Sequence, residues 1–206
     1  MNRSTRKAPV IGLTGGLACG KSTVGHLLEQ LGAVVLDTDT VAHELMRRGR
    51  PLFAKIVKRF GRGMVGADGE VDRRRLGRRV FASVRERRAL EALAHPPVKA
   101  FLRRWLKQRT AEGRVAVVLV PLLYEAGWGG GPWDAVICVT ASKRAAWARL
   151  RKRGLTPAEI KARWAAQWPP ARKAKKADFV VNNSGNRARL NQQVRAIWKQ
   201  LIEEER

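Results

Sequence analysis

Short apolar runs recur along the chain, and stretches with helical spacing of apolar residues separate them. Each run is rich in Val, Ile or Leu, which is typical of strands buried inside a parallel sheet. The five runs are 10–13, 33–36, 115–120, 135–139 and 178–181. The pattern predicts an α/β fold with a doubly wound, five-stranded parallel sheet, and an amphipathic helix at 190–205 that covers the sheet.

The first apolar run leads directly into a glycine-rich segment, G-G-L-A-C-G-K-S at 15–22, and a helical pattern follows it. This is the G-x-x-x-x-G-K-[ST] phosphate-binding loop (P-loop) in its required setting between a strand and a helix. Glycines let the backbone N–H groups point at phosphate oxygens, and the helix N-terminus adds partial positive charge. Lys21 would reach the β- and γ-phosphates, and the Ser22 hydroxyl would bind Mg²⁺. The alternative is a plain glycine-rich turn with a surface lysine.

Two carboxylates, Asp37 and Asp39, follow the second predicted strand, at the sheet edge where ligands of parallel α/β proteins bind. On an extended stretch they would point to opposite sides and differ in role. One would accept a proton from an attacking hydroxyl, while the other would hold structure or contact Mg²⁺-bound water. The alternative is that they cap the next helix.

Residues 40–110 contain helical spacing and many arginines but no strand candidate. Four glycines within 61–69 break the pattern. At His95-Pro96-Pro97 we expect a helix to end or bend sharply, because proline lacks the N–H that a helix needs. We interpret this block as a helical insertion that provides the pocket for a second substrate.

Cations and tryptophans dominate 143–177. Arg149 and Arg153 have i, i+4 spacing and would share a helix face, and Thr156-Pro157 would begin a second helix. The segment indicates a lid of two helices that places arginines over phosphates. The alternatives are a solvated basic hairpin, or a nucleic-acid surface on which the tryptophans at 147, 164 and 168 stack on bases.

The chain has 206 residues, and 42 Lys and Arg against 17 Asp and Glu give a net charge of +25. Such a balance suggests phosphorylated or polyanionic partners, but one phosphate site does not need so many cations. Cys19 and Cys138 lack metal-ligand spacing, and we interpret Cys19 as a small filler in the loop. No apolar run is long enough to cross a bilayer, and residues 1–9 lack the apolar region of a secretory signal, so we expect a cytoplasmic protein.

Together, the motifs resemble the dephospho-CoA kinase family over nearly the whole chain. They occur in the family's order: L-T-G-G-x-x-x-G-K-S at 13–22, D-x-D at 37–39, G-x-x-D-R at 69–73, V-F at 80–81, H-P at 95–96, P-L-L-Y-E at 121–125, R-x-x-x-Q at 163–167 and A-D-F-V-V-N-N at 177–183. The doubled glycine, the D-x-D and the P-L-L-[FY]-E motif are more selective than the P-loop alone. Departures include Tyr124 in place of the usual Phe, a glycine-rich stretch at 127–132, and the high charge.

The resemblance implies transfer of a phosphoryl group from ATP to the ribose 3′-hydroxyl of dephospho-CoA, with Mg²⁺. It implies catalytic roles for Asp39, Lys21, Arg149 and Arg153, with Asp39 as general base or orienting group. The implied ATP-binding residues are Gly15, Gly16, Ala18, Cys19, Gly20, Lys21, Ser22, Thr23 and Asn183. The implied acceptor-binding residues are Asp39, Arg73, His95, Leu122 and Glu125.

The implied domains are a basic tail at 1–9, a P-loop core at 10–39, 111–142 and 177–206, an acceptor domain at 40–110 and a lid at 143–176. Two other functions stay open at this point. One is a small-molecule kinase of the nucleoside-monophosphate type, which would share the loop and lid. The other is a basic P-loop protein that binds RNA or DNA, although no sequence-reading motif accompanies its charge.

Overall fold

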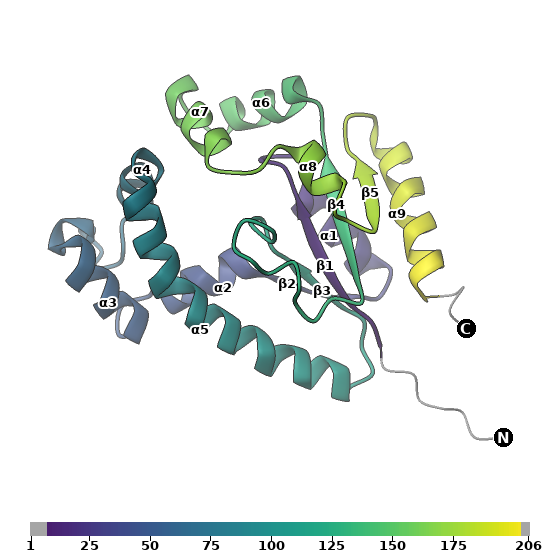
Figure 1. Cartoon of the computed structure of the whole chain (residues 1–206), viewed down its shortest axis with the longest axis horizontal. Helices are drawn as coiled ribbons and strands as arrows, with labels where there is room; N and C mark the ends of the chain where they lie inside the picture. The colour runs from purple at the N-terminus through teal and green to yellow at the C-terminus, as the bar shows by residue number, and fades with distance from the viewer. Residues whose placement is uncertain (1–7, 203–206) are drawn as a thin grey trace. The chain divides into compact units, whose positions relative to one another are not determined.

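The computed structural model describes residues 8–202, so most of the predicted basic tail lies outside the described residues. Its strands are β1 (Val10–Gly15), β2 (Val34–Asp37), β3 (Ala116–Leu119), β4 (Ala135–Thr140) and β5 (Phe179–Asn182). They form one sheet with the order β2-β3-β1-β4-β5, and every neighbouring pair is parallel (Figure 1). The predicted five-stranded parallel sheet is confirmed, and the ends of its strands differ from the expected ones by at most two residues.

The main core lies between this sheet and two helices, α1 (Lys21–Gln30) and α9 (Arg187–Ile202). Leu28 of α1 and Val194 of α9 are buried with Leu13, Val139 and other strand residues. The short helix α8 (Pro170–Ala174) contacts β1 and β4. Because the strands at the centre are covered, their side chains are apolar throughout rather than alternating.

The chain divides into two compact units. The first contains the residues up to Asp37, Trp105–Leu155 and the residues from Gln167 onward; the second contains Thr38–Arg104 and Thr156–Ala166. The predicted lid segment is shared between them, since α6 (Lys143–Lys152) and α8 belong to the first unit and α7 (Pro157–Ala165) to the second. A separately moving lid at 143–176 therefore stays a prediction.

The second unit is helical, as expected for 40–110. It contains α2 (Thr38–Leu45), α3 (Pro51–Phe60), the short 3₁₀ helix η1 (Arg62–Met64), α4 (Arg73–Ala82), α7 and much of α5 (Val84–Ala111). Its core includes Leu52, Ile56, Phe60, Leu76 and Val80.

The expectation that a helix ends at His95-Pro96-Pro97 is wrong, because α5 continues through both prolines. A sharp bend at this point stays a prediction. A proline inside a helix costs about 3 kcal/mol, since it removes a hydrogen bond and crowds the preceding turn. Ala94, Val98 and Leu102 recur every four residues on α5 and are all buried. Burial of this continuous apolar stripe offsets the cost of the prolines.

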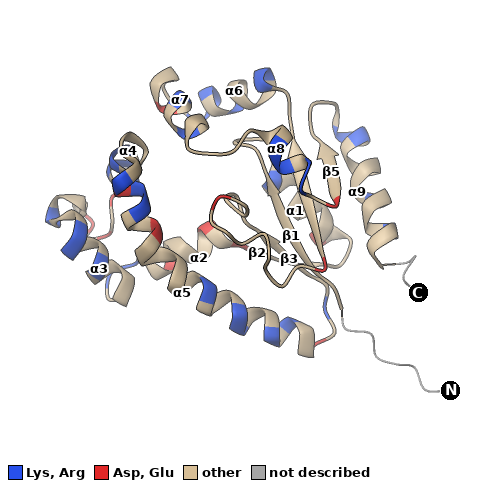
Figure 2. Ribbon diagram, in the orientation of Figure 1, with Lys and Arg blue, Asp and Glu red and all other residues tan. Residues whose placement is uncertain are grey.

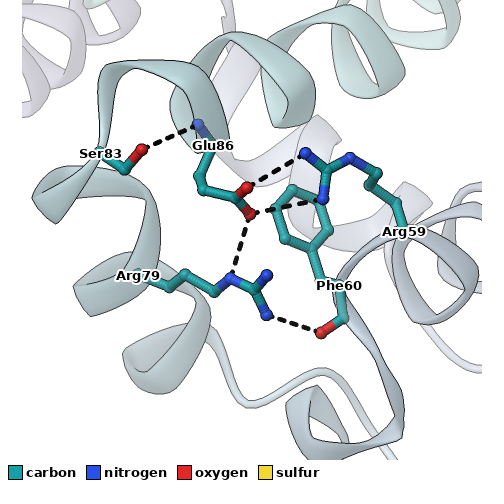
Figure 3. A network of polar contacts seen from close by, with 5 residues as sticks. All are labelled: Arg59, Phe60, Arg79, Ser83 and Glu86. Carbon is teal, nitrogen blue, oxygen red and sulfur yellow. Dashed lines mark hydrogen bonds and ion pairs between the residues drawn. The ribbon is translucent and has the colours of Figure 1, made fainter.

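A carboxylate network joins three helices of the second unit (Figure 3). Glu86 of α5 pairs with Arg59 of α3 and Arg79 of α4, each at 3.1 Å. Both guanidinium groups also lie over the ring of Phe60, whose carbonyl accepts a hydrogen bond from Arg79. Glu86 thus links α3, α4 and α5 by charge as well as by packing.

Positive charge is spread over many helices rather than gathered on one element (Figure 2). Lys and Arg occur along α3, α4, α5, α6 and α8 (Figure 2). Within residues 8–202, no helix is both long enough and apolar enough to span a membrane.

We predict that Glu86→Gln lowers the melting temperature at pH 7, because Gln removes the charge that pairs with both arginines. The hydrogen bond from Arg59 is the main reason that the pKa of Glu86 lies below its ordinary value of 4.5. A lowered pKa contributes stability that is fully present above pH 4.5 and is lost as the pH falls through the folded-state pKa. The difference between variant and wild type should therefore shrink between pH 5 and pH 3 in melts followed by circular dichroism, as expected for carboxylate titration.

Glu29→Gln, on the exposed surface of α1, is the matched control and should change the melting temperature little at any pH. A Glu86→Gln deficit that stayed constant from pH 7 to pH 3 would contradict the charge-based explanation.

Candidate active site

The P-loop has the backbone geometry that phosphate binding needs. The chain leaves β1 at Gly15, and α1 begins after Gly20, whose φ is 97°. A β-carbon at Gly15 would overlap the carbonyl oxygen of Val139, and one at Gly20 would overlap the side-chain amide of Asn183. Ala18 has a positive φ of 52°, which is uncommon for a residue with a side chain. Glycine at both ends of the loop is therefore required by close packing as well as by backbone conformation.

Side chains from distant elements donate hydrogen bonds to the carbonyl oxygens of this loop. The Asn183 amide donates to the Cys19 carbonyl at 2.8 Å. Arg149 of α6 donates to the Ala18 carbonyl at 3.2 Å and to the Asn183 carbonyl at 3.0 Å. The structure thus brings the predicted residues Arg149 and Asn183 to the P-loop, where they hold its backbone.

Lys21 is the first residue of α1, and its ammonium donates to the carbonyls of Gly15 at 3.4 Å and Gly16 at 3.0 Å. Ser22 is exposed in the same first turn, and Thr23 is partly buried. Among residues 8–202 there is no group of three or more His, Cys, Asp or Glu side chains that could hold a metal ion. Binding of Mg²⁺ by the Ser22 hydroxyl therefore stays a prediction.

Arg153 does not make the hydrogen bonds to the P-loop that Arg149 makes. It follows the last residue of α6 and is exposed. The expectation that Arg149 and Arg153 share one helix face is wrong, because α6 ends at Lys152 and Arg153 is its C-cap. A role for Arg153 in neutralising transferred phosphate stays a prediction.

Cys19 is buried in the P-loop, and burial is the main cause of the raised pKa of its thiol. A buried thiol with a raised pKa stays protonated and has little nucleophilic character. This supports the interpretation of Cys19 as a filler whose backbone, rather than its side chain, serves the loop.

Glu125 of the P-L-L-Y-E motif forms an ion pair that the sequence did not predict. Its carboxylate pairs with Lys173 of α8 at 2.8 Å and accepts a hydrogen bond from the backbone N–H of Trp168 at 2.8 Å. Lys173 lies in the run R-K-A-K-K at 172–176, which looks like a solvated surface. Nothing in the local pattern distinguishes it from its exposed neighbours, because its partner lies 48 positions earlier in the chain. Leu122 of the same motif is half-buried.

In the second unit, α2 carries the predicted catalytic carboxylate. The expectation that Asp37 and Asp39 lie on one extended stretch is wrong, because Asp37 ends β2 and α2 begins at Thr38. Asp39 is exposed in the first turn of α2, where a helix N-terminus favours an anion. His43 lies one turn further on the same helix face.

A pocket of about 510 Å³ adjoins this face of α2. It is lined by His43, Glu44, Met46, Arg47, Asp68, Glu70, Val71 and Arg73. Arg73, a predicted acceptor-binding residue, is 2.9 Å from Nδ1 of His43. Because a guanidinium can only donate, Nδ1 of His43 is the acceptor in this contact. The pocket lining combines the guanidinium groups of Arg47 and Arg73 with the carboxylates of Glu44, Asp68 and Glu70. Binding of the acceptor by Arg73 stays a prediction.

His95 is half-buried within α5, and burial is the main cause of its lowered pKa, so the ring is neutral near pH 7. A smaller, mostly apolar pocket of about 200 Å³ lies in the second unit, where Arg163 stacks on Phe81 at 4.9 Å. His95 does not line either of these two pockets. Its assignment to acceptor binding stays a prediction.

Comparisons with known proteins agree with the motifs. A family model described as dephospho-CoA kinase matches residues 9–189. A dephospho-CoA kinase of Symbiobacterium thermophilum is 48% identical over 192 residues, which cover 92% of this chain and 80% of that relative. A dephospho-CoA kinase of Geobacillus kaustophilus is 42% identical over 193 residues, which cover 92% of this chain and 95% of that relative.

Solved structures show the same relationship. The Thermus thermophilus protein TT1252 superposes with a TM-score of 0.77 at 34% identity, over 95% of this chain and 99% of its own. A dephospho-CoA kinase from Campylobacter jejuni has a TM-score of 0.69 at 26% identity, over 96% of this chain and 98% of its own. A shikimate kinase from Acinetobacter baumannii, with a TM-score of 0.54 and 16% identity, shares the fold alone. Since the family model and relatives above 40% identity cover most of its length, the chain belongs to the dephospho-CoA kinase family.

Proposed function

We propose that this chain transfers the γ-phosphoryl group of ATP to the ribose 3′-hydroxyl of dephospho-CoA, giving coenzyme A and ADP. The observation that carries the proposal is the complete P-loop between β1 and α1, in a chain of the dephospho-CoA kinase family. Phosphoryl transfer requires mainly positioning and neutralisation of charge, which this loop and its surrounding cations can supply.

On the donor side, the backbone N–H groups of 15–20 and the N-terminus of α1 would hold the phosphates. Lys21 would exchange the carbonyl oxygens of Gly15 and Gly16 for β- and γ-phosphate oxygens. Arg149 holds the Ala18 and Asn183 carbonyls and would keep the loop in its binding shape. The Ser22 hydroxyl would bind Mg²⁺, and that ion supplies neutralisation of the phosphate charge.

On the acceptor side, Asp39 would orient the attacking hydroxyl and accept its proton. Arg73, with Arg47 in the same pocket, would bind the phosphates of dephospho-CoA, because guanidinium groups match phosphate oxygens well. Leu122, His95 and Glu125 would contribute to acceptor binding as the family resemblance implies. A cytoplasmic location belongs to the proposal, since both substrates are intracellular metabolites.

We predict that the purified protein forms coenzyme A from Mg·ATP and dephospho-CoA, and releases ADP only when dephospho-CoA is present. The measurement is a coupled ADP assay, with the product identified by mass spectrometry. Nucleosides, nucleoside monophosphates and shikimate form the comparison panel, and Lys21→Ala is the inactive control. Normal ATP binding without any coenzyme A formation would overturn the proposal, and preference for a nucleoside monophosphate would favour the other kinase class.

We predict that Asp39→Asn lowers kcat by about 10²–10⁴-fold, the usual contribution of a general base. The ATP dissociation constant should change little, because the donor phosphates are held by the P-loop. Single-turnover kinetics together with ATP titration separate the two effects. A variant with near-normal kcat would mean that Asp39 serves only the first turn of α2.

We predict that Arg149→Lys raises the KM for ATP or lowers kcat, with a combined loss of about tenfold, the size expected for one charge-assisted hydrogen bond. Lysine keeps the charge but lacks the planar fork that reaches two carbonyls at once. Steady-state kinetics test this against Arg144→Lys, an exposed position of the same helix, which should behave as wild type. Equal behaviour of the two variants would show that the fork geometry of Arg149 does not matter.

A further inference from the structure

Lys173 of α8 is completely buried. Its ammonium lies 2.8 Å from the Glu125 carboxylate, 2.7 Å from the Pro121 carbonyl and 3.4 Å from the Gly15 carbonyl. An ammonium has three N–H donors, and here each donor has an acceptor. A neutral amine has only two, so this arrangement fits the charged form, stabilised by the Glu125 carboxylate.

This contact set joins three segments that are far apart in sequence. Pro121 follows β3, Gly15 ends β1 and opens the P-loop, and Lys173 comes from α8. Glu125 also accepts from the Trp168 backbone N–H, so it holds the segment that precedes α8. Burial lowers the pKa of Lys173, and the facing carboxylate of Glu125 acts in the opposite direction.

The Gly15 carbonyl has two lysine donors. The ammonium of Lys21 and that of Lys173 each lie 3.4 Å from its oxygen. Under the proposed mechanism, Lys21 leaves this oxygen for the phosphates of ATP. A buried carbonyl without a donor raises the free energy of the protein. That increase would make the binding of ATP less favourable. Lys173 would remain on the same oxygen after Lys21 had moved.

We propose that Lys173 is a positioning residue of the ATP site, which holds the Gly15 carbonyl and the start of the P-loop in place while Lys21 transfers to the phosphates. Glu125 acts as its counter-ion and fixes it between the loop and the end of β3. This inference rests on the proposed function for the movement of Lys21, and adds a residue to the donor side of that site.

The competing explanation is that Glu125 and Lys173 are only a structural ion pair. Removing one member of a buried pair destabilises a protein strongly, because the other charge is left without compensation. Replacing both members by neutral groups is often tolerated. The double replacement therefore distinguishes an effect on the stability of the fold from an effect on the affinity for ATP.

The experiment compares Lys173→Met, the double variant Glu125→Gln with Lys173→Met, and the control Lys176→Met, which removes a charge from an exposed site of the same run. Melting temperatures are measured by circular dichroism, and Mg·ATP binding by calorimetry without acceptor. Because the acceptor is absent, any effect of Glu125 on dephospho-CoA binding does not enter the result. The KM values for ATP and dephospho-CoA are measured afterwards.

We expect the single variant to melt well below wild type, and the double variant to regain much of that loss. In the double variant the ATP dissociation constant should still be about tenfold or more higher than in wild type, since the charge-assisted bond to Gly15 is gone. Lys176→Met should match wild type in both measurements. A double variant that binds ATP within about twofold of wild type would overturn the proposal, because that is below the effect of one such bond.

Failure of this inference and failure of the proposed function are distinguishable. A wild-type protein that binds Mg·ATP but forms no coenzyme A would refute the reaction, and the calorimetric comparison of variants would still test Lys173. A protein that forms coenzyme A, with a double variant that binds ATP normally, would keep the reaction and remove Lys173 from the ATP site.

Discussion

The structure of this chain depends on how the carbonyl oxygens of the P-loop find hydrogen-bond donors. A loop that turns its N–H groups toward phosphate must turn carbonyl groups away from it, and buried carbonyls require partners. Here the carbonyls of Gly15, Gly16, Ala18 and Cys19 all accept from side chains. The donors come from α1, α6, α8 and the residue after β5, so the loop is held by most of the first unit.

This constraint explains why Asn183 and Arg149 form hydrogen bonds to the loop backbone. Asn183 closes against Gly20 so tightly that a β-carbon there would overlap it. Arg149 uses two of its guanidinium nitrogens on backbone oxygens. Preorganised donors of this kind lose little entropy when the ligand binds, and the loop does not have to be reshaped. Binding and folding therefore use the same contacts.

The sequence was sufficient to predict the sheet, the P-loop and the helical nature of the second unit, because each is encoded by local periodicity or by a spaced motif. Three local predictions were wrong. One helix runs through Pro96 and Pro97, α2 begins before Asp39, and α6 ends before Arg153, because packing outside the local window decides where helices begin and end. Lys173 and His43 were missed for a related reason: their partners Glu125 and Arg73 are 48 and 30 positions away. A pattern of neighbours cannot show which cation of a basic run is buried.

Most of the positive charge of the chain is on exposed side chains rather than in buried contacts such as these. Lys173 is the one charged side chain classed as fully buried among residues 8–202, and it is paired, as the cost of burying charge requires. Most other cations lie on helix surfaces of both units, where water and salt screen them and individual pairs add little stability (Figure 2). Their sum still creates a positive potential that attracts anions at low ionic strength. ATP and dephospho-CoA are both polyanions, so under the proposed function this surface charge would attract both substrates, whereas the few fixed cations at the P-loop would hold the phosphates.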